Sequence, residues 1–366
     1  MGPGILTSSD TFLPQATNIR QPTSISSIVT DGKKVYVGSL NGTIRGWNLA
    51  SGKHEGTFSG HRDVVNDMVI LNDGTMVSAS DDHSVIYWST KSFDKILKYN
   101  GPEKSATSCL VIYDRELATS LKIAKGERVV FGASWDGKVY LWDIDNANPA
   151  RVLLGHPAPV KKIVYFEGKH GKSLASGCTN GEIWVWDMKN FTIINKIQAH
   201  LETVCHLRTH NGLLLSSGKD AACGRRSSKV KIWDSDFKIV NEFETGQDHV
   251  NKFFVLQNRF LVTASTKSVE VWDMKSNKEV VERRQNTEIV ASIAPMNNDG
   301  ILIAKSHGVH LIRYLNKKKF LLKVLHNFRG QARYPPVVVK QIYESILGDA
   351  EVSLNGIDIR KFTESF

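Results

Sequence analysis

Histidine, serine and aspartate recur together along this chain, and many hydrolases build a nucleophile and its base from these residue types. His61, Ser78 and Asp82 form one set, and Trp88 follows it closely. Such a trio could activate a serine for acyl transfer. Comparable sets recur farther along, each beside a tryptophan: His156, Ser176, Asn180 and Trp186, and then His200, Ser216, Asp220 and Trp233. Recurrence beside a tryptophan indicates a structural role, so we predict a protein that is not an enzyme and has no catalytic residues.

Other sequence signals for chemistry are absent. The chain has four cysteines, but no two of them have the CxxC spacing that zinc sites commonly use. The GxxxxGK[ST] loop that holds nucleotide phosphates is missing as well. We therefore predict no metal and no cofactor, and we expect most cysteines to be small buried residues.

The tryptophans belong to a repeat with a common plan. An apolar pair leads into small residues, an Asp or Asn marks a turn, and alternating apolar residues end at Trp, as in Val129–Asp143 and Ser173–Asp187. Six tryptophans and one tyrosine occupy the last position, at intervals of 39 to 54 residues: Trp47, Trp88, Trp142, Trp186, Trp233, Trp272 and Tyr314. A period of about 40–45 residues is typical of a four-stranded propeller blade.

Each repeat is predicted to form strands. Apolar residues alternate on either side of turn dipeptides such as Asn41-Gly42, Asp136-Gly137 and Asn180-Gly181. Seven such units, arranged radially, can bury both faces of each sheet and supply the core that no single unit could bury. We therefore predict an all-β fold, a seven-bladed β-propeller, with a short C-terminal helix and hairpin as an extension.

From about Thr23 to Val324 the chain resembles the WD-repeat family. In that family a Gly-His pair precedes each blade, and the His shares hydrogen bonds with a Ser or Thr, the turn Asp and the Trp. The resemblance implies this structural role for Gly60-His61 with Ser78, Asp82 and Trp88, and for the two later sets. The chemistry is reasonable, because a buried indole N–H and a buried carboxylate both need partners.

Other blades depart from the family pattern. The fourth repeat carries Asn180 in place of Asp, and the third repeat has Gly101-Pro102 where Gly-His is expected. The first has Val37 at the Ser position. The sixth keeps Thr263 but has no turn acid, and the seventh rests on its strand pattern and Tyr314. We expect the blades without the network to rely on packing alone.

Three regions are predicted: an N-terminal arm at 1–20, the propeller at 21–330, and a helix and hairpin extension at 331–366. Ring closure is left open. An N-terminal strand could complete the last blade, as is frequent in the family, or Phe320–Val324 could serve as its outer strand while Ser8–Arg20 packs as an arm. The extension either docks a partner or packs on its own propeller.

Propellers generally bind partners on the face where the loops before the first strands and after the second strands converge. The residue before the turn Asp points to that face. In this chain those positions are Leu40, Asp81, Trp135, Thr179 and Lys219. Large aromatic residues are enriched at binding hot spots, although Trp135 could instead cover a gap left by the missing His of its blade. The predicted partner-binding residues are Trp135, Arg62, Asp81, Lys219, Arg225 and Arg226.

The formal charge is +10 at neutral pH, with 47 basic and 37 acidic residues. Such a surface favours acidic partners, namely nucleic acid, phosphorylated segments, anionic lipid or acidic proteins, or it serves solubility alone. No signal peptide or stretch long enough to span a membrane is visible in the sequence, so we expect an intracellular protein, cytoplasmic or nuclear. The leading prediction is a scaffold that presents its loops to a protein or peptide, as a monomer within a larger complex. The alternative is a propeller associated with nucleic acid.

Overall fold

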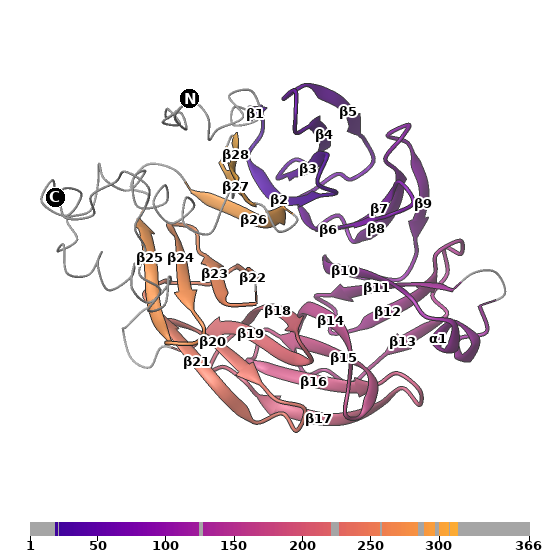
Figure 1. Ribbon diagram of the computed structural model, residues 1–366. Helices are drawn as coiled ribbons and strands as arrows, with labels where there is room; N and C mark the ends of the chain where they lie inside the picture. The colour runs from indigo at the N-terminus through magenta and orange to yellow at the C-terminus, as the bar shows by residue number, and fades with distance from the viewer. Residues whose placement is uncertain are drawn as a thin grey trace, which may run out of the picture.

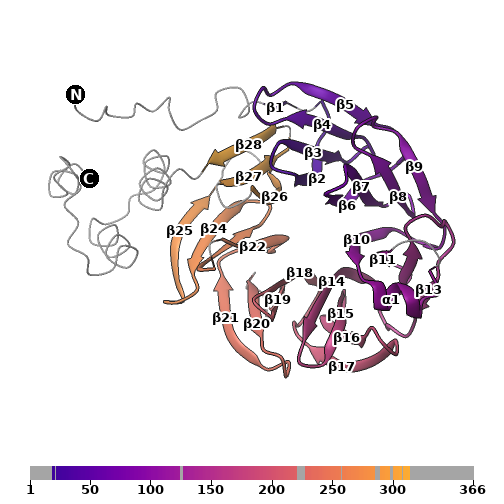
Figure 2. The same ribbon diagram turned by 45° about the vertical axis from the view of Figure 1, so that its right-hand side comes forward.

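A ring of antiparallel sheets surrounds a central axis. The computed structural model describes residues 19–20, 22–123, 127–220, 227–256, 258–284, 289–296, 300–306 and 308–313. Within these residues the strands form seven four-stranded sheets. Figure 1 and Figure 2 show them radiating from the axis as the blades of a propeller. The predicted fold class is confirmed.

In each blade the strands run from the axis outward. The first two blades comprise β2 (Ile25–Thr30), β3 (Lys34–Ser39), β4 (Ile44–Asn48) and β5 (His54–Phe58), then β6 (Val65–Leu71), β7 (Thr75–Ser80), β8 (Ser84–Ser89) and β9 (Lys95–Tyr99). Blades three and four comprise β10 (Ala106–Tyr113), β11 (Arg128–Ser134), β12 (Val139–Asp143) and β13 (Arg151–Leu153), then β14 (Val160–Gly168), β15 (Gly171–Cys178), β16 (Glu182–Asp187) and β17 (Thr192–Gln198).

The remaining blades follow the same plan. Blades five and six comprise β18 (Val204–His210), β19 (Leu213–Lys219), β20 (Ser228–Trp233) and β21 (Ile239–Thr245), then β22 (Lys252–Leu256), β23 (Phe260–Ala264), β24 (Ser268–Asp273) and β25 (Lys278–Arg284). Blade seven comprises β26 (Val290–Met296), β27 (Gly300–Lys305), β28 (Gly308–Arg313) and β1 (Ile19–Arg20).

The core lies between neighbouring blades, because each sheet is covered on both faces. Phe58 of blade one meets Trp88 of blade two edge to face, with ring centroids 5.6 Å apart. Both side chains are buried with Met68, Met76 and other apolar residues of the two blades. Inner strands of adjacent blades are also in contact all round the axis, from β2 through β26 and back to β2. Apolar burial between repeats is therefore what joins the ring.

Ring closure uses the N-terminal end of the described chain. Ile19 pairs with Val309 and Arg20 with Gly308, so that β1 is the outer strand of blade seven. Ile19 is buried against Ile25, Val309 and their neighbours. These two residues were expected in the arm at 1–20, and they lie in the propeller sheet instead. The alternative strand Phe320–Val324, the Tyr314 position and the extension at 331–366 lie outside the described residues.

A short helix, which the sequence pattern did not predict, interrupts blade three. Helix α1 (Arg115–Ser120) lies in the connection between β10 and β11, and Asp114 caps its first turn by accepting a hydrogen bond from the Leu117 N–H. Tyr165 and Lys172 of blade four also bond to the Asp114 carboxylate, at 2.6 Å and 3.0 Å. These bonds lower the pKa of Asp114 against the opposing effect of burial. Among the described helices, none has the length and apolar character needed to cross a bilayer.

Candidate partner-binding face

Antiparallel blades place their connections on two opposite ends of the ring. The turns between second and third strands lie on one end, together with the loops that lead into the next blade, and we call this end the loop face. Four predicted positions occupy equivalent places on it. Each donates its backbone N–H to the carbonyl just before the inner strand of its own blade: Leu40 to Ser24, Asp81 to Val64, Trp135 to Ser105 and Thr179 to Pro159, at 2.9 to 3.0 Å.

The loop face is continuous from blade to blade. Gly42, Gly137 and Gly181 occupy turns between second and third strands with φ angles of +81°, +79° and +86°. Each lies against the loop that precedes the next blade, beside the backbone carbonyls of His61, His156 and His200 respectively. A side chain at these positions would meet that backbone, so glycine allows the turn of one blade and the loop of the next to pack together.

Two blades contain the full hydrogen-bonded set. In blade two, His61 contacts Ser78 through Nε2 at 2.7 Å and Asp82 through Nδ1 at 3.0 Å. The Trp88 indole N–H donates to the same Ser78 hydroxyl at 2.7 Å. In blade five, His200 bridges Ser216 at 2.8 Å and Asp220 at 2.5 Å, and Trp233 donates to Ser216 at 2.9 Å. The histidine, serine and tryptophan of both sets are buried.

Blade four uses a different partner from the one expected. His156 contacts Ser176 through Nε2 at 3.1 Å, and Trp186 donates to Ser176 at 2.9 Å. The other ring nitrogen of His156 lies 3.2 Å from the Cys178 sulfur, whereas the Asn180 side chain accepts from the Glu182 backbone N–H. Burial lowers the pKa of His156 to about 4. A neutral imidazole needs no carboxylate, which is why a thiol can stand beside it.

Blade three replaces the missing histidine with a tyrosine. The Tyr140 hydroxyl donates to Asp136 at 2.8 Å, and its ring stacks on Trp142 with centroids 5.6 Å apart. The Trp142 N–H donates to the Asn100 carbonyl at 2.8 Å. Tyr140, and not Trp135, therefore fills this place.

Blades one and six have no such set among the described residues. The buried indole nitrogens of Trp47 and Trp272 and the Thr263 hydroxyl lack a hydrogen-bond partner there. These blades are held by packing, as in the contact between Phe243 and Trp272, whose ring centroids are 5.9 Å apart.

The predicted partner-binding residues differ in how far they are available. Trp135 is 44% exposed, and Arg62 is exposed one residue after His61. Asp81 is half-buried and already accepts hydrogen bonds from Asn66 and from the Ser105 hydroxyl, so it ties blade two to blade three. Lys219 is partly buried and lies 3.4 Å from Glu202. Arg225 and Arg226 lie outside the described residues.

Exposed leucines on the loop face were absent from the predicted binding set. Leu40, Leu154 and Leu201 are 50%, 62% and 62% exposed. Leu40 lies in a turn, whereas Leu154 and Leu201 lie in loops leading to the next blade. Leu201 directly follows His200, and a large apolar residue in such a loop was the available sequence signal. These exposed apolar side chains add to the apolar surface of the loop face, on which a partner could bury area.

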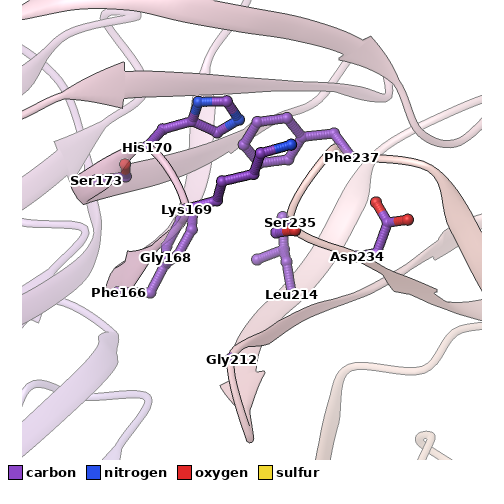
Figure 3. Close-up of a pocket in the computed structure, with 10 residues that line it drawn as sticks. All are labelled: Phe166, Gly168, Lys169, His170, Ser173, Gly212, Leu214, Asp234, Ser235 and Phe237. Atoms are coloured by element: carbon purple, nitrogen blue, oxygen red, sulfur yellow. The ribbon is translucent and has the colours of Figure 1, made fainter.

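A pocket lies at the opposite end of the ring. Its lining comes from the connections between first and second strands of blades four and five and from the turn between third and fourth strands of blade five: Phe166, Gly168, Lys169, His170, Ser173, Gly212, Leu214, Asp234, Ser235 and Phe237. Figure 3 shows the His170 and Phe237 rings facing each other above it, stacked with centroids 5.7 Å apart. Lys169 pairs with Asp236 at 2.6 Å. Its groups are thus engaged with each other, and it contains none of the predicted residues.

Comparisons with known proteins agree with this geometry. The family model "WD domain, G-beta repeat" matches residues 52–89, which run from the end of blade one through the third strand of blade two. The chain is 25% identical to the ribosome biogenesis protein YTM1 of Candida glabrata, in an alignment that covers 69% of this chain and 65% of that protein.

Other relatives cover different shares of the chain. The ribosome biogenesis protein YTM1 of Eremothecium gossypii is 21% identical over 81% of this chain and 74% of that protein. The pre-mRNA-splicing factor cwf17 of Schizosaccharomyces pombe is 29% identical over 34% of each chain. Of the Candida glabrata protein, this chain spans 65%, which is less than two thirds of its length.

Proposed function

The chain is a WD-repeat β-propeller, and from that premise we propose that it is a non-catalytic scaffold whose loop face binds a protein partner within a multiprotein assembly. The observation that carries the proposal is the exposure of Trp135 on the loop face, which also carries exposed leucines and Arg62. Exposed aromatic and arginine side chains on a face with apolar residues are the composition that binding surfaces favour.

The assembly that we propose is one that builds ribonucleoprotein particles inside the cell. The names of two relatives support this class, one a ribosome biogenesis protein and one a splicing factor. The formal charge of +10 supports it as well, because a basic propeller remains near an acidic particle while its loop face contacts a protein.

The test is affinity purification of the tagged full chain from its native cell, with the co-purifying proteins quantified by mass spectrometry. Trp135→Ala is the test variant. Tyr113→Ala is the matched control, because Tyr113 is an aromatic residue with 59% exposure at the opposite end of the ring. We expect the proteins bound to the wild type to fall at least tenfold with Trp135→Ala, as for loss of a hot spot worth about 2 kcal/mol. Tyr113→Ala should leave them in place.

A nuclease arm separates the second candidate, direct binding of nucleic acid. Partners that survive nuclease treatment and depend on Trp135 support the scaffold. Partners lost on nuclease treatment, with association that weakens steeply as salt increases, support the nucleic-acid function instead. Equal recovery with both alanine variants after nuclease treatment would contradict the loop face as the binding surface.

A further inference from the structure

Seven equivalent positions on the inner strands form one level around the axis. Six of them lie one paired position inside the start of their strands, opposite the next-to-last paired residue of the second strand. In the sixth blade Lys252 begins β22 opposite Ala264, and it follows the buried Val250 by two residues, as Lys162 follows Val160. The positions are Ser27, Asp67, Ser108, Lys162, His206, Lys252 and Ser292. Such a level would be apolar if it served packing alone, whereas every residue here is polar or charged.

Contacts between blades show that these side chains meet inside the ring. The Asp67 carboxylate of blade two accepts hydrogen bonds from Ser108 of blade three at 2.9 Å and from Lys162 of blade four at 2.5 Å. On the other side, the Lys252 ammonium donates to the Ser292 hydroxyl at 2.9 Å. One contact thus skips a whole blade, which is geometrically feasible only toward the axis.

The charges at this level do not balance among the described residues. Lys162, Lys252 and Arg208, which lies two residues after His206 on β18, are three cations that face one carboxylate, Asp67. Asp67 pairs with Lys162, and the guanidinium of Arg208 has neither an ion pair nor a hydrogen bond to any described residue. Two positive charges are therefore left without a counterion in a largely buried setting, where each is costly.

His206 adds an unused hydrogen-bonding atom at the same place. Its side chain is buried, and its Nδ1 has no hydrogen-bond partner in the described part of the chain. Burial, together with the positive charges of Lys162, Lys252 and Arg208, lowers the pKa of His206 well below its usual value. Burial is also the main cause that lowers the pKa of Lys252 to about 8. Both groups would be protonated more readily if an anion lay beside them.

We propose that Lys162, His206, Arg208 and Lys252 form a binding site for a compact phosphate-bearing small molecule on the propeller axis. Two uncompensated positive charges match a phosphate group, which carries nearly two negative charges at neutral pH. A tetrahedral oxyanion can accept hydrogen bonds from several directions, as this ring of donors requires. The side chains of Lys162 and Asp67 are only 16% and 9% exposed, so the site suits a free small anion rather than a nucleic-acid backbone.

Isothermal titration calorimetry of the purified full chain with inorganic phosphate and pyrophosphate tests the site. Lys252→Met and Arg208→Gln remove one cation each, and Lys95→Gln removes an exposed cation of the outer strand β9 as a control. We expect saturable binding to the wild type, at least a tenfold loss of affinity in each axial variant, and no change with Lys95→Gln. Absence of saturable binding, or an equal loss in the control, would overturn the proposal.

Thermal unfolding provides a second readout, because the variants that lose affinity for the anion should gain stability in its absence. Without added anion, Lys252→Met and Arg208→Gln should raise the melting temperature, because each removes a largely buried charge without a carboxylate partner. With pyrophosphate, the wild type and Lys95→Gln should gain more stability than the two axial variants. Axial variants that gain as much as the wild type would contradict the site.

Proton uptake measured on the wild type does not depend on how any variant folds. The groups facing one another here are Asp67, Lys162, His206, Arg208 and Lys252, with the Cys109 thiol nearby. Anion binding should take up protons, seen as a binding enthalpy that depends on the buffer, and the affinity should fall as the pH rises through about 8, where Lys252 loses its proton. Binding without proton uptake is the contrary result. A phosphoserine peptide that binds more tightly than pyrophosphate would overturn the assignment to a small molecule.

Discussion

A tryptophan N–H can only donate a hydrogen bond, so an acceptor nearby stabilises a buried indole. In blades two, four and five a serine hydroxyl is that acceptor, and it also contacts a histidine. The group on the far side of the histidine varies, from Asp82 to the Cys178 thiol to Asp220. The serine and histidine are therefore the constant part of the network in these three blades, whereas the residue that contacts the other side of the histidine differs.

The carboxylate of Asp82 makes stability depend on pH. Burial by itself raises the pKa of Asp82, but hydrogen bonds from His61 and Ser84 outweigh it and hold the pKa far below its usual value. A lowered pKa contributes stability that is present above the unfolded-state pKa of about 4 and is lost as the pH falls toward the folded-state value. Asp82→Asn should therefore cost about 2 kcal/mol at pH 7 and less near pH 3.

Urea denaturation at the two pH values measures this difference. Asp63→Asn, in the exposed loop of the same blade, is the control and should cost little at either pH. A cost for Asp82→Asn that does not change between the two pH values would contradict the role of its charge.

At the scale of the element, the turns between second and third strands decide how blades join. Gly171 and Gly181 have nearly the same backbone angle, with φ of +81° and +86°. Gly171 begins β15, next to the turn between the first and second strands of blade four, and open space lies where a side-chain methyl group would point. At Gly181, in the turn between the second and third strands, a methyl group would collide with the His200 carbonyl of the next loop. The two positions therefore separate backbone strain from a clash between blades.

Alanine substitution at these two glycines should have unequal effects. Gly171→Ala carries only the cost of the left-handed backbone, about 1 kcal/mol. Gly181→Ala should cost about 3 kcal/mol or more, because the turn and the following loop must also move apart. Chemical denaturation of both variants provides the comparison, and equal losses would show that the turn does not support the adjoining blade.

At the scale of the whole molecule, the ring is closed by segments from opposite ends of the described chain. β1 supplies two residues to a sheet whose other strands begin at Val290. Figure 2 shows β1 beside blade one, close to β28. Each blade buries its apolar faces against its two neighbours. A seventh blade without β1 would therefore expose apolar residues of blades one and seven.

Ile19 is the residue through which closure can be tested. It is 1% exposed and packs against apolar residues of blades one and seven. Ile19→Asp would bury a charge without a partner and should cost about 3 kcal/mol or more, whereas Ile19→Val keeps the contact and should cost about 1 kcal/mol. Thermal and urea unfolding of the two variants measure the difference. Similar stabilities would contradict a closing role for β1.

The sequence by itself determined the seven repeats, the strand pattern and the hydrogen-bonded sets of blades two and five. These depend on residues close in the sequence, where alternation, turn glycines and a regular tryptophan interval act locally. Only the tertiary structure decided that β1 closes the ring, that Cys178 and Tyr140 take the places expected of other residues, and that cations gather on the axis. β1 and the axial cations join residues of different blades, which meet only when the ring has formed. Cys178 and Tyr140 act within their own blades, where side-chain packing and not the repeat pattern decides which residue contacts the histidine or the turn Asp.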